Sequence, residues 1–429
     1  MFAGSLARAG RIETAHGIVH TPALTVAATK ATVKALAPED LHFASPGEAS
    51  RGKCALMCNT YHLYLQPGDE VIKKAGGLHK FMSWQGPIWT DSGGFQAFSL
   101  GEALGRNISK FTSWDEPEPR GLKTEKSRNL PQARIDDDGV TFYSHIDGSE
   151  QRFTPERSIQ IQPNLGADII LAFDECVSPH APREAHEKAV ERTKLWAERS
   201  MRERARLQAD NSLRVSSEKI PRNVAVNHPP SAPSLWGIVQ GGRYEDLRRR
   251  SAKEIAALGR TPLSLGGVGF DGFGIGGSFA KEDMGTAVRW VCEELPEDKP
   301  RHLLGVGEPE DIFAAVENGV DTFDCVAATR KARNGQLYTH KGEINITSAK
   351  FKELFEAVDR ECGCSTCRNY TAAYLHHLFK SSELLAYRLA SIHNLFFIIN
   401  LTKQIRLSIF DNTFHNFKSD FLNKFGADV

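Results

Sequence analysis

An aspartate at the end of an apolar run is the first candidate for chemistry in this sequence. The run covers residues 320–323, Asp324 follows it, and three basic residues come soon after: Arg330, Lys331 and Arg333. A carboxylate at a strand end can act as a nucleophile or as an acid and base, and a basic loop can hold an anionic substrate. In isolation, an ordinary strand end beside a solvated turn would look the same. The remaining residues decide between these interpretations.

Three cysteines crowd into one short stretch, Cys362, Cys364 and Cys367, and His393 follows in a helical pattern. Three thiolates and one imidazole fill the tetrahedron of a zinc ion and leave no position open, so we expect one structural zinc ion. Two other histidines could supply the fourth ligand instead: His376 and His377. Free thiols at this density would be open to oxidation, which makes a chance cluster a poor explanation.

A glycine-rich segment carries groups suited to a flat heterocycle. Asp91 and Ser92 begin it, two glycines follow, and Phe95 comes next. Glycines let a ligand approach the backbone, an aromatic ring can stack on the heterocycle, and a carboxylate can accept hydrogen bonds from its edge. A glycine-rich turn capped by an aspartate would show the same pattern. Both interpretations stay open at this point.

Further positions match the edge of a guanine-like base. Asp174 offers an acceptor, Gln240 offers an amide that can donate or accept, and the pair Gly276 and Gly277 offers an exposed backbone donor. A guanine edge presents N–H donors beside a carbonyl acceptor, so this set is complementary to it. An ion pair with an arginine is the alternative explanation for Asp174.

The elements that must position these residues repeat one pattern, in which a short apolar run ends in a polar residue or glycine and a helical stretch follows. The runs cover residues 23–26, 55–58, 87–90, 168–173, 235–239, 273–275, 302–304 and 320–323. Helical patterns cover residues 182–207, 244–258, 284–295 and 310–318. Eight such units predict an α/β fold, a (β/α)8 TIM barrel. In a barrel the strand ends share one mouth, so the polar strand-end residues should converge there.

The predicted domain organisation is a barrel followed by a smaller lobe. Residues 1–340 form the catalytic barrel, and residues 341–429 form a zinc-binding helical subdomain packed on it. Two long segments without periodicity, 103–134 and 209–233, interrupt the repeat and are interpreted as surface insertions.

Charge and hydropathy limit the classes of protein. Lys plus Arg and Asp plus Glu both number 53, so the formal net charge is zero and a polyanion must be bound by a local patch. The first residues contain no apolar signal-peptide core, and the apolar stretch 384–401 is broken by polar residues such as Arg388 and Asn394. We therefore expect a cytoplasmic protein in which this stretch is a packed helix, with no membrane contact.

Six motifs occur in a fixed order along the chain. They are Asp91-Ser-Gly-Gly-Phe-Gln, Asp174-Glu-Cys, Gly237-Ile-Val-Gln-Gly, Gly276-Gly277, Thr322-Phe-Asp324-Cys, and Cys362-x-Cys364-x2-Cys367 with His393. With these motifs the chain resembles the tRNA-guanine transglycosylases of the bacterial type, over nearly its whole length. The resemblance implies a pentosyltransferase that exchanges the wobble guanine of tRNAs with a GUN anticodon for the queuosine precursor preQ1. It also implies one structural zinc ion and a homodimer.

The resemblance assigns roles to the motif residues. Asp324 would be the nucleophile that forms a covalent intermediate with the ribose, and Asp91 would contact the base and handle its proton. The base would be bound by Ser92, Phe95, Asp174, Gln240, Gly276 and Gly277. The anticodon loop would be held by Arg330, Lys331 and Arg333.

Two departures from the family pattern leave the incoming base open. Ser278-Phe279-Ala280 stands where bacterial members usually have Leu-Ala-Val, and Ala327-Ala328 stands where Leu-Pro is common. The alternatives are an enzyme that inserts queuine, a non-catalytic tRNA-binding subunit of the same fold, and an unrelated zinc-dependent barrel hydrolase. The last of these would need an open zinc site at the barrel mouth.

Overall fold

Eight parallel strands close into a barrel in the computed structural model, which describes residues 4–41, 54–97, 133–217, 232–258, 269–277 and 279–426, with the side chains of 211–217 excepted. Around the barrel the strands follow in the order β3 (Ala23–Ala27), β4 (Ala55–Cys58), β5 (Ile88–Thr90), β9 (Ile169–Leu171), β10 (Ser234–Val239), β11 (Gly272–Ile275), β12 (Arg301–Leu304) and β13 (Thr322–Cys325), and β13 pairs again with β3. Each strand overlaps one of the eight predicted runs, and β13 begins two residues later than its run and includes Asp324. The predicted barrel is therefore confirmed.

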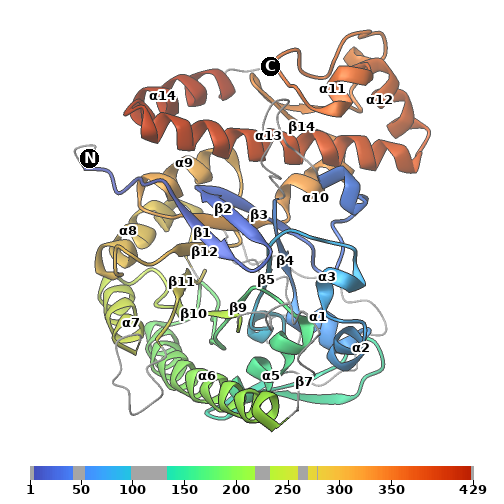
Figure 1. Ribbon diagram of the computed structural model, residues 1–429. Coiled ribbons are helices and arrows are strands. Elements are labelled where there is room, and N and C mark those ends of the chain that lie inside the picture. Colours follow the sequence, from blue (N-terminus) through green and yellow to red (C-terminus); the bar gives the residue numbers. More distant parts are fainter. Residues whose placement is uncertain are drawn as a thin grey trace.

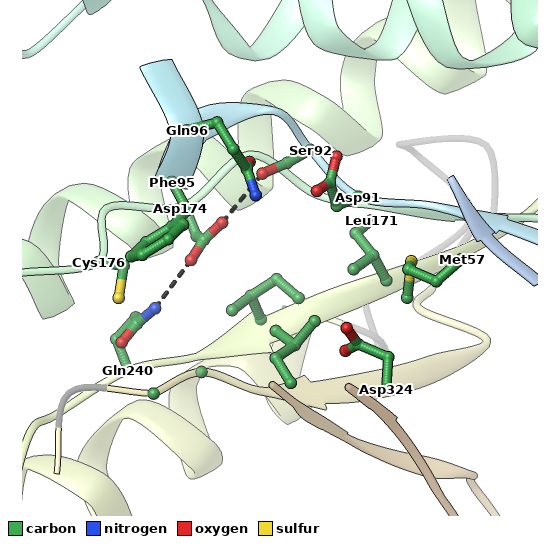
Figure 2. A pocket seen from close by; sticks show the side chains of 14 residues that line it. Met57, Asp91, Ser92, Phe95, Gln96, Leu171, Asp174, Cys176, Gln240 and Asp324 are labelled. Carbon is green, nitrogen blue, oxygen red and sulfur yellow. Dashed lines mark hydrogen bonds between the residues drawn. The ribbon is translucent and has the colours of Figure 1, made fainter. Parts of the chain in front are cut away.

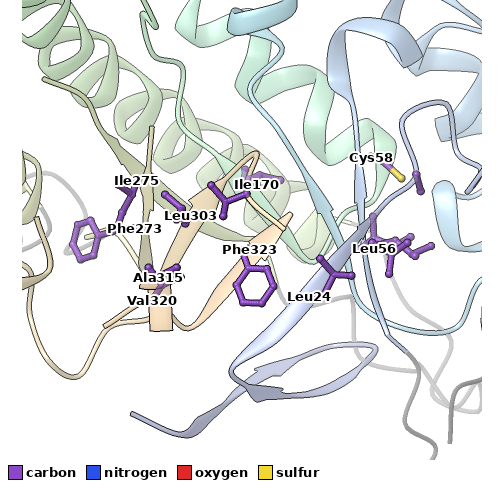
Figure 3. Close-up of a cluster of buried hydrophobic side chains, with 14 of the residues drawn as sticks. Leu24, Leu56, Cys58, Ile170, Phe273, Ile275, Leu303, Ala315, Val320 and Phe323 are labelled. Carbon is purple, nitrogen blue, oxygen red and sulfur yellow. The ribbon is translucent and has the colours of Figure 1, made fainter. Parts of the chain in front are cut away.

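The strands are apolar on both faces because each face is buried. Inward-pointing residues such as Met57, Trp89 and Trp236 form a core inside the barrel, where the two indole rings meet edge to face at 6.2 Å. Outward-pointing residues such as Leu303 and Phe323 belong to a larger hydrophobic core, part of which Figure 3 shows. Burial on both faces is typical of parallel strands, and it explains why these runs do not alternate with polar residues.

Helices surround the barrel (Figure 1). They are α1 (Thr60–Leu65), α2 (Asp69–Lys74), α3 (Leu78–Phe81), α5 (Pro155–Leu165), α6 (Arg183–Ser217), α7 (Glu245–Leu258), α8 (Met284–Glu294) and α9 (Pro309–Glu317). Two 3-10 turns accompany them, η1 (Pro38–Leu41) and η4 (Lys281–Asp283). Helix α6 continues to Ser217, so the first part of the segment 209–233 is helical. The rest of that segment up to residue 231, and residues 103–132 of the other predicted insertion, lie outside the described residues.

Two small sheets flank the barrel. The hairpin of β1 (Gly10–Thr14) and β2 (Gly17–Thr21) packs Ile12 and Val19 against the core inside the barrel. His16 in its turn contacts Asp168, the residue before β9, at 2.7 Å. The hairpin therefore closes the end of the barrel where the strands begin. The second sheet contains β6 (Arg134–Asp136), β7 (Gly139–Tyr143) and β8 (Glu150–Phe153).

The C-terminal part of the chain forms a lobe above the barrel in Figure 1. It contains β14 (Gln336–Thr339), β15 (Gly342–Asn345), η5 (Ala349–Phe351), α11 (Ser365–Asn369), α12 (Ala372–Lys380), α13 (Leu384–Phe410) and α14 (Phe414–Phe425). Helix α13 is long and apolar enough to cross a membrane, but it is largely buried and packs against α10 (Ala327–Arg333) and β3. It is the core helix of this lobe.

The polar residues within α13 anchor it. Asn394 donates to the carbonyl oxygens of Ala328 and Gln336, both at 3.0 Å, and Arg388 pairs with Asp40 at 2.8 Å. These contacts join the lobe to the barrel and to the segment after β3.

Candidate active site and metal site

One cavity opens where the barrel strands end, and fourteen residues line it (Figure 2). It encloses about 520 Å³, including space open to solvent at its mouth. Eight predicted residues from distant parts of the chain meet here: Asp91, Ser92, Phe95, Asp174, Gln240, Gly276, Gly277 and Asp324. The lining also includes residues that were not among the predicted site residues: Met57, Gln96, Leu171, Cys176, Ile238 and Leu304. Most of these lie on the strands, so inward-facing strand positions could have indicated them.

Asp324 reaches the cavity from β13, and its neighbours hold one of its oxygens. The carboxylate Oδ1 lies 3.2 Å from Nε2 of His302 and accepts a hydrogen bond from the backbone N–H of Gly305, also at 3.2 Å. His302 is fully buried on β12, and its Nδ1 lies 2.9 Å from the hydroxyl of Thr322. If the Thr322 hydroxyl donates to Nδ1, the Nε2–H donates to the carboxylate. His302 on β12 thus orients the carboxylate of Asp324.

Asp91 follows β5 and is held by the start of α1. The backbone N–H of Thr60 donates to Oδ1 at 2.9 Å, and the side-chain amide of Asn59 donates to Oδ2. Asn59 also caps α1, because its side-chain oxygen accepts from the backbone N–H of His62. Donors at a helix start favour a carboxylate in its charged form. Asp91 is therefore placed as an oriented anion at the cavity wall.

Asp174, which follows β9, accepts hydrogen bonds from two other cavity residues. The hydroxyl of Ser92 donates to its Oδ1 at 3.1 Å, and the amide nitrogen of Gln240 donates to its Oδ2 at 2.8 Å (Figure 2). In that view Asp174, Gln240 and Phe95 lie toward the left of the cavity, Ser92 and Asp91 lie near each other at its top, and Asp324 lies at the lower right. Asp174 and Gln240 thus stand on the side of the cavity away from Asp324.

Two glycines allow these segments to approach each other. A Cβ atom on Gly94 would lie 2.9 Å from the backbone oxygen of Asp174, and one on Gly276 would lie 2.3 Å from the amide nitrogen of Gln240. Side chains at these positions would displace the two residues whose polar groups line the cavity. The glycines are therefore required by close packing around the site.

Several titratable groups next to the cavity residues in the chain or in space have shifted pKa values. Burial raises the pKa of the Cys58 and Cys325 thiols to about 12, so both stay protonated at neutral pH. Burial, together with the nearby charge of Lys30, lowers the pKa of His62 to about 4, so this imidazole stays neutral. Burial also raises the pKa of Glu175, which is paired with Arg192 at 2.6 Å.

The basic segment after Asp324 is a helix, α10, and the prediction of a loop was wrong. Its residues are alanine, threonine, arginine and lysine, among which alanine and the long basic side chains favour helix. Arg330 is exposed, but Lys331 is held by Glu308 at 2.9 Å and by Glu343. Arg333 is half-buried, and burial lowers its pKa. The three side chains therefore differ in their access to a ligand.

The metal cluster has the geometry of a tetrahedral site. Nδ1 of His393 lies 3.6, 3.5 and 3.3 Å from the sulfur atoms of Cys362, Cys364 and Cys367. Ligand atoms held roughly 2.0 to 2.3 Å from a tetrahedral zinc ion lie about 3.5 Å apart. All four residues are buried, so the cluster is closed and suits a structural zinc ion.

Neighbouring groups prepare these residues as ligands. Nε2 of His393 lies 2.6 Å from the backbone oxygen of Tyr338, which accepts its N–H and leaves Nδ1 for a metal. The backbone N–H of Cys367 donates to the sulfur of Cys364 at 3.2 Å. The alternative ligands are not part of the cluster, since His376 contacts the carbonyl of Ile346 at 2.8 Å and His377 is exposed.

A second group of possible ligands lies at the opposite end of the barrel. His16, His79 and Asp168 approach one another there, under the first hairpin. Among the described residues, neither this group nor the cysteine cluster belongs to the cavity lining. A metal ion held by either group would therefore lie outside the cavity lining.

Comparisons with known proteins place the chain among close relatives. The family model described as queuine tRNA-ribosyltransferase matches residues 3–427. A queuine tRNA-ribosyltransferase of Thermoanaerobacter pseudethanolicus is 42% identical over 420 residues, which cover 98% of this chain and 94% of the relative. One of Streptococcus suis is 40% identical over 423 residues, covering 98% and 93%. A putative queuine tRNA-ribosyltransferase of Archaeoglobus fulgidus is 41% identical over 429 residues, covering 97% and 96%.

Proposed function

The chain belongs to the queuine tRNA-ribosyltransferase family and is a tRNA-guanine transglycosylase, and we propose that it exchanges the wobble guanine of GUN-anticodon tRNAs for preQ1 through a covalent intermediate on Asp324. The observation that carries this proposal is the meeting of Asp91 and Asp324 with a set of groups complementary to guanine in the lining of one cavity.

The proposed chemistry is a double displacement at C1′ of the ribose. Asp324 attacks C1′, the bond from C1′ to N9 of guanine breaks, and its electron pair leaves with the base. The departing guanine anion takes a proton from solvent, which reaches the cavity through its open mouth. In the second half, Asp91 accepts the proton of the incoming base, the base nitrogen attacks C1′, and the bond to Asp324 breaks. Two inversions retain the configuration at C1′, as in retaining glycosidases.

Orientation of the nucleophile supports this assignment. His302 and the N–H of Gly305 hold one oxygen of Asp324, and the side chain is 19% exposed at the cavity. An oriented carboxylate avoids the cost of ordering it in each reaction cycle. The neighbouring thiol of Cys325 does not compete with it, because burial raises the pKa of that thiol to about 12.

The polar groups on the base-binding side of the cavity are complementary to guanine. We assign Asp174 as acceptor for N1–H and the 2-amino group, and Gln240 with the backbone N–H of Gly277 as donors to O6. Phe95 supplies a ring on which the purine stacks. In the free protein Ser92 and Gln240 satisfy the carboxylate of Asp174. Entry of guanine replaces these two hydrogen bonds with its own and frees the Gln240 amide for O6.

At the family departure, Phe279 lies outside the residues that line the cavity. It is fully buried, and its ring packs against the guanidinium of Arg248 at 4.9 Å. The resemblance to the bacterial type is the reason to propose preQ1 as the incoming base. Insertion of queuine is the second candidate.

We also propose how the chain meets its macromolecular partners. Arg330 is exposed on α10, in the helix that follows Asp324, and is suited to a phosphate of the anticodon loop. Lys331 and Arg333 add positive charge to the same surface, although their side chains are less exposed than that of Arg330. A cytoplasmic homodimer with one zinc ion per chain remains our expectation for the whole enzyme.

Base exchange on a GUN tRNA tests the function. The purified chain should incorporate radiolabelled guanine, and preQ1 should compete more strongly than queuine. Absence of guanine incorporation would reject the enzyme in favour of a non-catalytic subunit, and stronger competition by queuine would reject preQ1.

A trapped adduct tests the nucleophile. The wild-type protein should form a complex with tRNA that resists denaturation, and Asp324→Asn should form none. Asp91→Asn is the matched comparison, because it should retain the adduct and slow the exchange. An adduct that persists with Asp324→Asn would refute the assignment.

A further inference from the structure

Arg248 on α7 is a fully buried arginine whose partners are backbone oxygens. Its guanidinium donates to the carbonyl oxygen of Gly242 at 2.7 Å and to that of Val239 at 3.4 Å, on either side of Gln240. It also donates to the carbonyl oxygens of Gly276 and Gly277, at 3.0 and 2.8 Å. One side chain therefore ties together the two strand-end loops that bring Gln240 and the paired glycines to the cavity.

This placement is costly for a cation. Burial lowers the pKa of Arg248 to about 9, which still leaves it charged at neutral pH. Within the described residues it forms no ion pair with a carboxylate, and the ring of Phe279 covers it at 4.9 Å. The next residue, Arg249, pairs instead with three surface carboxylates, those of Glu245, Glu293 and Glu294. Arg248 is thus satisfied by carbonyl groups alone, and its position depends on their geometry.

The hydrogen bonds of Arg248 set the orientation of a peptide at the cavity. A trans peptide unit is planar, and its N–H and C=O point in opposite directions. Because the oxygen of Gly276 faces Arg248, the N–H of Gly277 in the same peptide unit faces the other way, toward the cavity that both glycines line.

Glycine cannot hold this orientation by itself. Its backbone can adopt many conformations, and no side chain restrains it. A side chain on Gly276 is excluded, because its Cβ would lie 2.3 Å from the Gln240 amide. The restraint must come from another residue, and Arg248 supplies it on the side away from the cavity.

We propose that Arg248 is a positioning residue for base recognition, which holds the N–H of Gly277 and the backbone that carries Gln240 in the places from which both residues can donate to the 6-oxo group of the purine. This inference rests on the proposed function. It predicts that Arg248 affects discrimination at position 6 of the base far more than it affects tRNA affinity, which phosphate contacts dominate.

The test compares two bases that differ at position 6 alone. In 6-thioguanine a sulfur atom, which is a weak acceptor, replaces the oxygen, while N1–H and the 2-amino group remain. The measurements are the KM of guanine in exchange, the Ki of 6-thioguanine, the KM of tRNA and the thermal midpoint. The variants are Arg248→Met, which removes all four hydrogen bonds, and Arg248→Lys, which keeps the charge. Arg249→Met is the matched control on the same helix.

For the wild type, the Ki of 6-thioguanine should exceed the KM of guanine about tenfold, the value of one hydrogen bond. For Arg248→Met, the Ki of 6-thioguanine and the KM of guanine should agree within about twofold. The ratio of these two constants in Arg248→Lys should lie between those of Arg248→Met and the wild type. In Arg249→Met the ratio should equal that of the wild type. The KM of tRNA should change less than the KM of guanine, because phosphate contacts dominate the affinity for tRNA. A role in folding alone would lower the thermal midpoint and kcat but leave the ratio unchanged.

An unchanged ratio in a folded Arg248→Met protein would overturn the inference while leaving the exchange activity in place. If Arg248→Met does not fold, Arg248→Lys decides by the same ratio. Failure of the wild type to incorporate guanine would instead remove the proposed function, and this inference with it.

Discussion

Asp174→Asn removes one negative charge from the cavity while preserving the shape of the side chain. In the free protein Asp174 accepts from Ser92 at 3.1 Å and from Gln240 at 2.8 Å. Asparagine can retain both contacts, because its oxygen accepts from Gln240 and its amide donates to the oxygen of the Ser92 hydroxyl. The variant should therefore fold, and its defect should concern the base.

The size of the defect follows from the hydrogen bonds to guanine. The carboxylate accepts from N1–H and from the 2-amino group, and a hydrogen bond to a charged group is worth about 1.5 to 3 kcal/mol. Asparagine offers one oxygen, and its amide turns a donor toward the remaining donor of the base. One bond is lost and the other weakened, a total of about 3 kcal/mol or a factor of about 100 in affinity for guanine.

Hypoxanthine provides the assay, because it lacks the 2-amino group and keeps N1–H and O6. In the wild type, the Ki of hypoxanthine as a competitor should exceed the KM of guanine by about 10 to 100-fold, the value of one charge-assisted bond. In Asp174→Asn the two constants should become nearly equal. Asp138→Asn is the control, since that side chain is 85% exposed and lies outside the cavity lining.

A ratio that stays the same in Asp174→Asn would refute the assignment of Asp174 to the 2-amino edge. A reduced ratio in the Asp138→Asn control would show that the assay responds to net charge and not to base recognition.

His393→Ala should weaken zinc binding more than about 100-fold, because it removes a direct ligand and not a residue that only hydrogen-bonds to a ligand. It should also lower the thermal midpoint. Metal analysis of the purified chain and calorimetry check these two results. His302→Phe should lower kcat about 10 to 100-fold and leave tRNA affinity unchanged, because one charge-assisted hydrogen bond to Asp324 is lost. Single-turnover kinetics and tRNA-binding measurements check this. A fall in tRNA affinity with an unchanged kcat would contradict it. Arg330→Gln should reduce the slope of log affinity for tRNA against log salt concentration by about 1. Lys331→Gln should leave this slope unchanged, because Glu308 and Glu343 already hold the ammonium group of Lys331. Equal slopes in both variants would argue against a phosphate contact of Arg330. The folded pKa of His62, about 4, lies below the ordinary value of 6.5, so between these values the unfolded chain binds more protons and the protein loses stability as pH falls. His62→Gln should flatten urea-derived stability over this pH range, and an unchanged pH profile would show that His62 does not contribute.

Local sequence patterns were sufficient to predict the barrel strands and the residues at their ends. Apolar runs ending in a polar residue or glycine mark buried parallel strands, and the geometry of a barrel brings their ends to one mouth. Asp91, Asp174 and Asp324 could therefore be grouped in one site before any distance was known. The spacing of the three cysteines likewise predicted a metal cluster, because their chemistry lies within one short segment.

Other features depend on contacts between segments that are distant in sequence. The basic stretch after Asp324 packs as a helix against α13, whereas its sequence alone was interpreted as a loop. His302 orients Asp324 across two neighbouring strands. Arg248 holds two strand-end loops through their carbonyl oxygens, and these backbone acceptors leave no pattern in the sequence. The amino-acid sequence thus predicted which residues gather at the cavity and in the cysteine cluster. The tertiary structure decided which neighbours hold them, because hydrogen-bond partners are selected by packing in three dimensions.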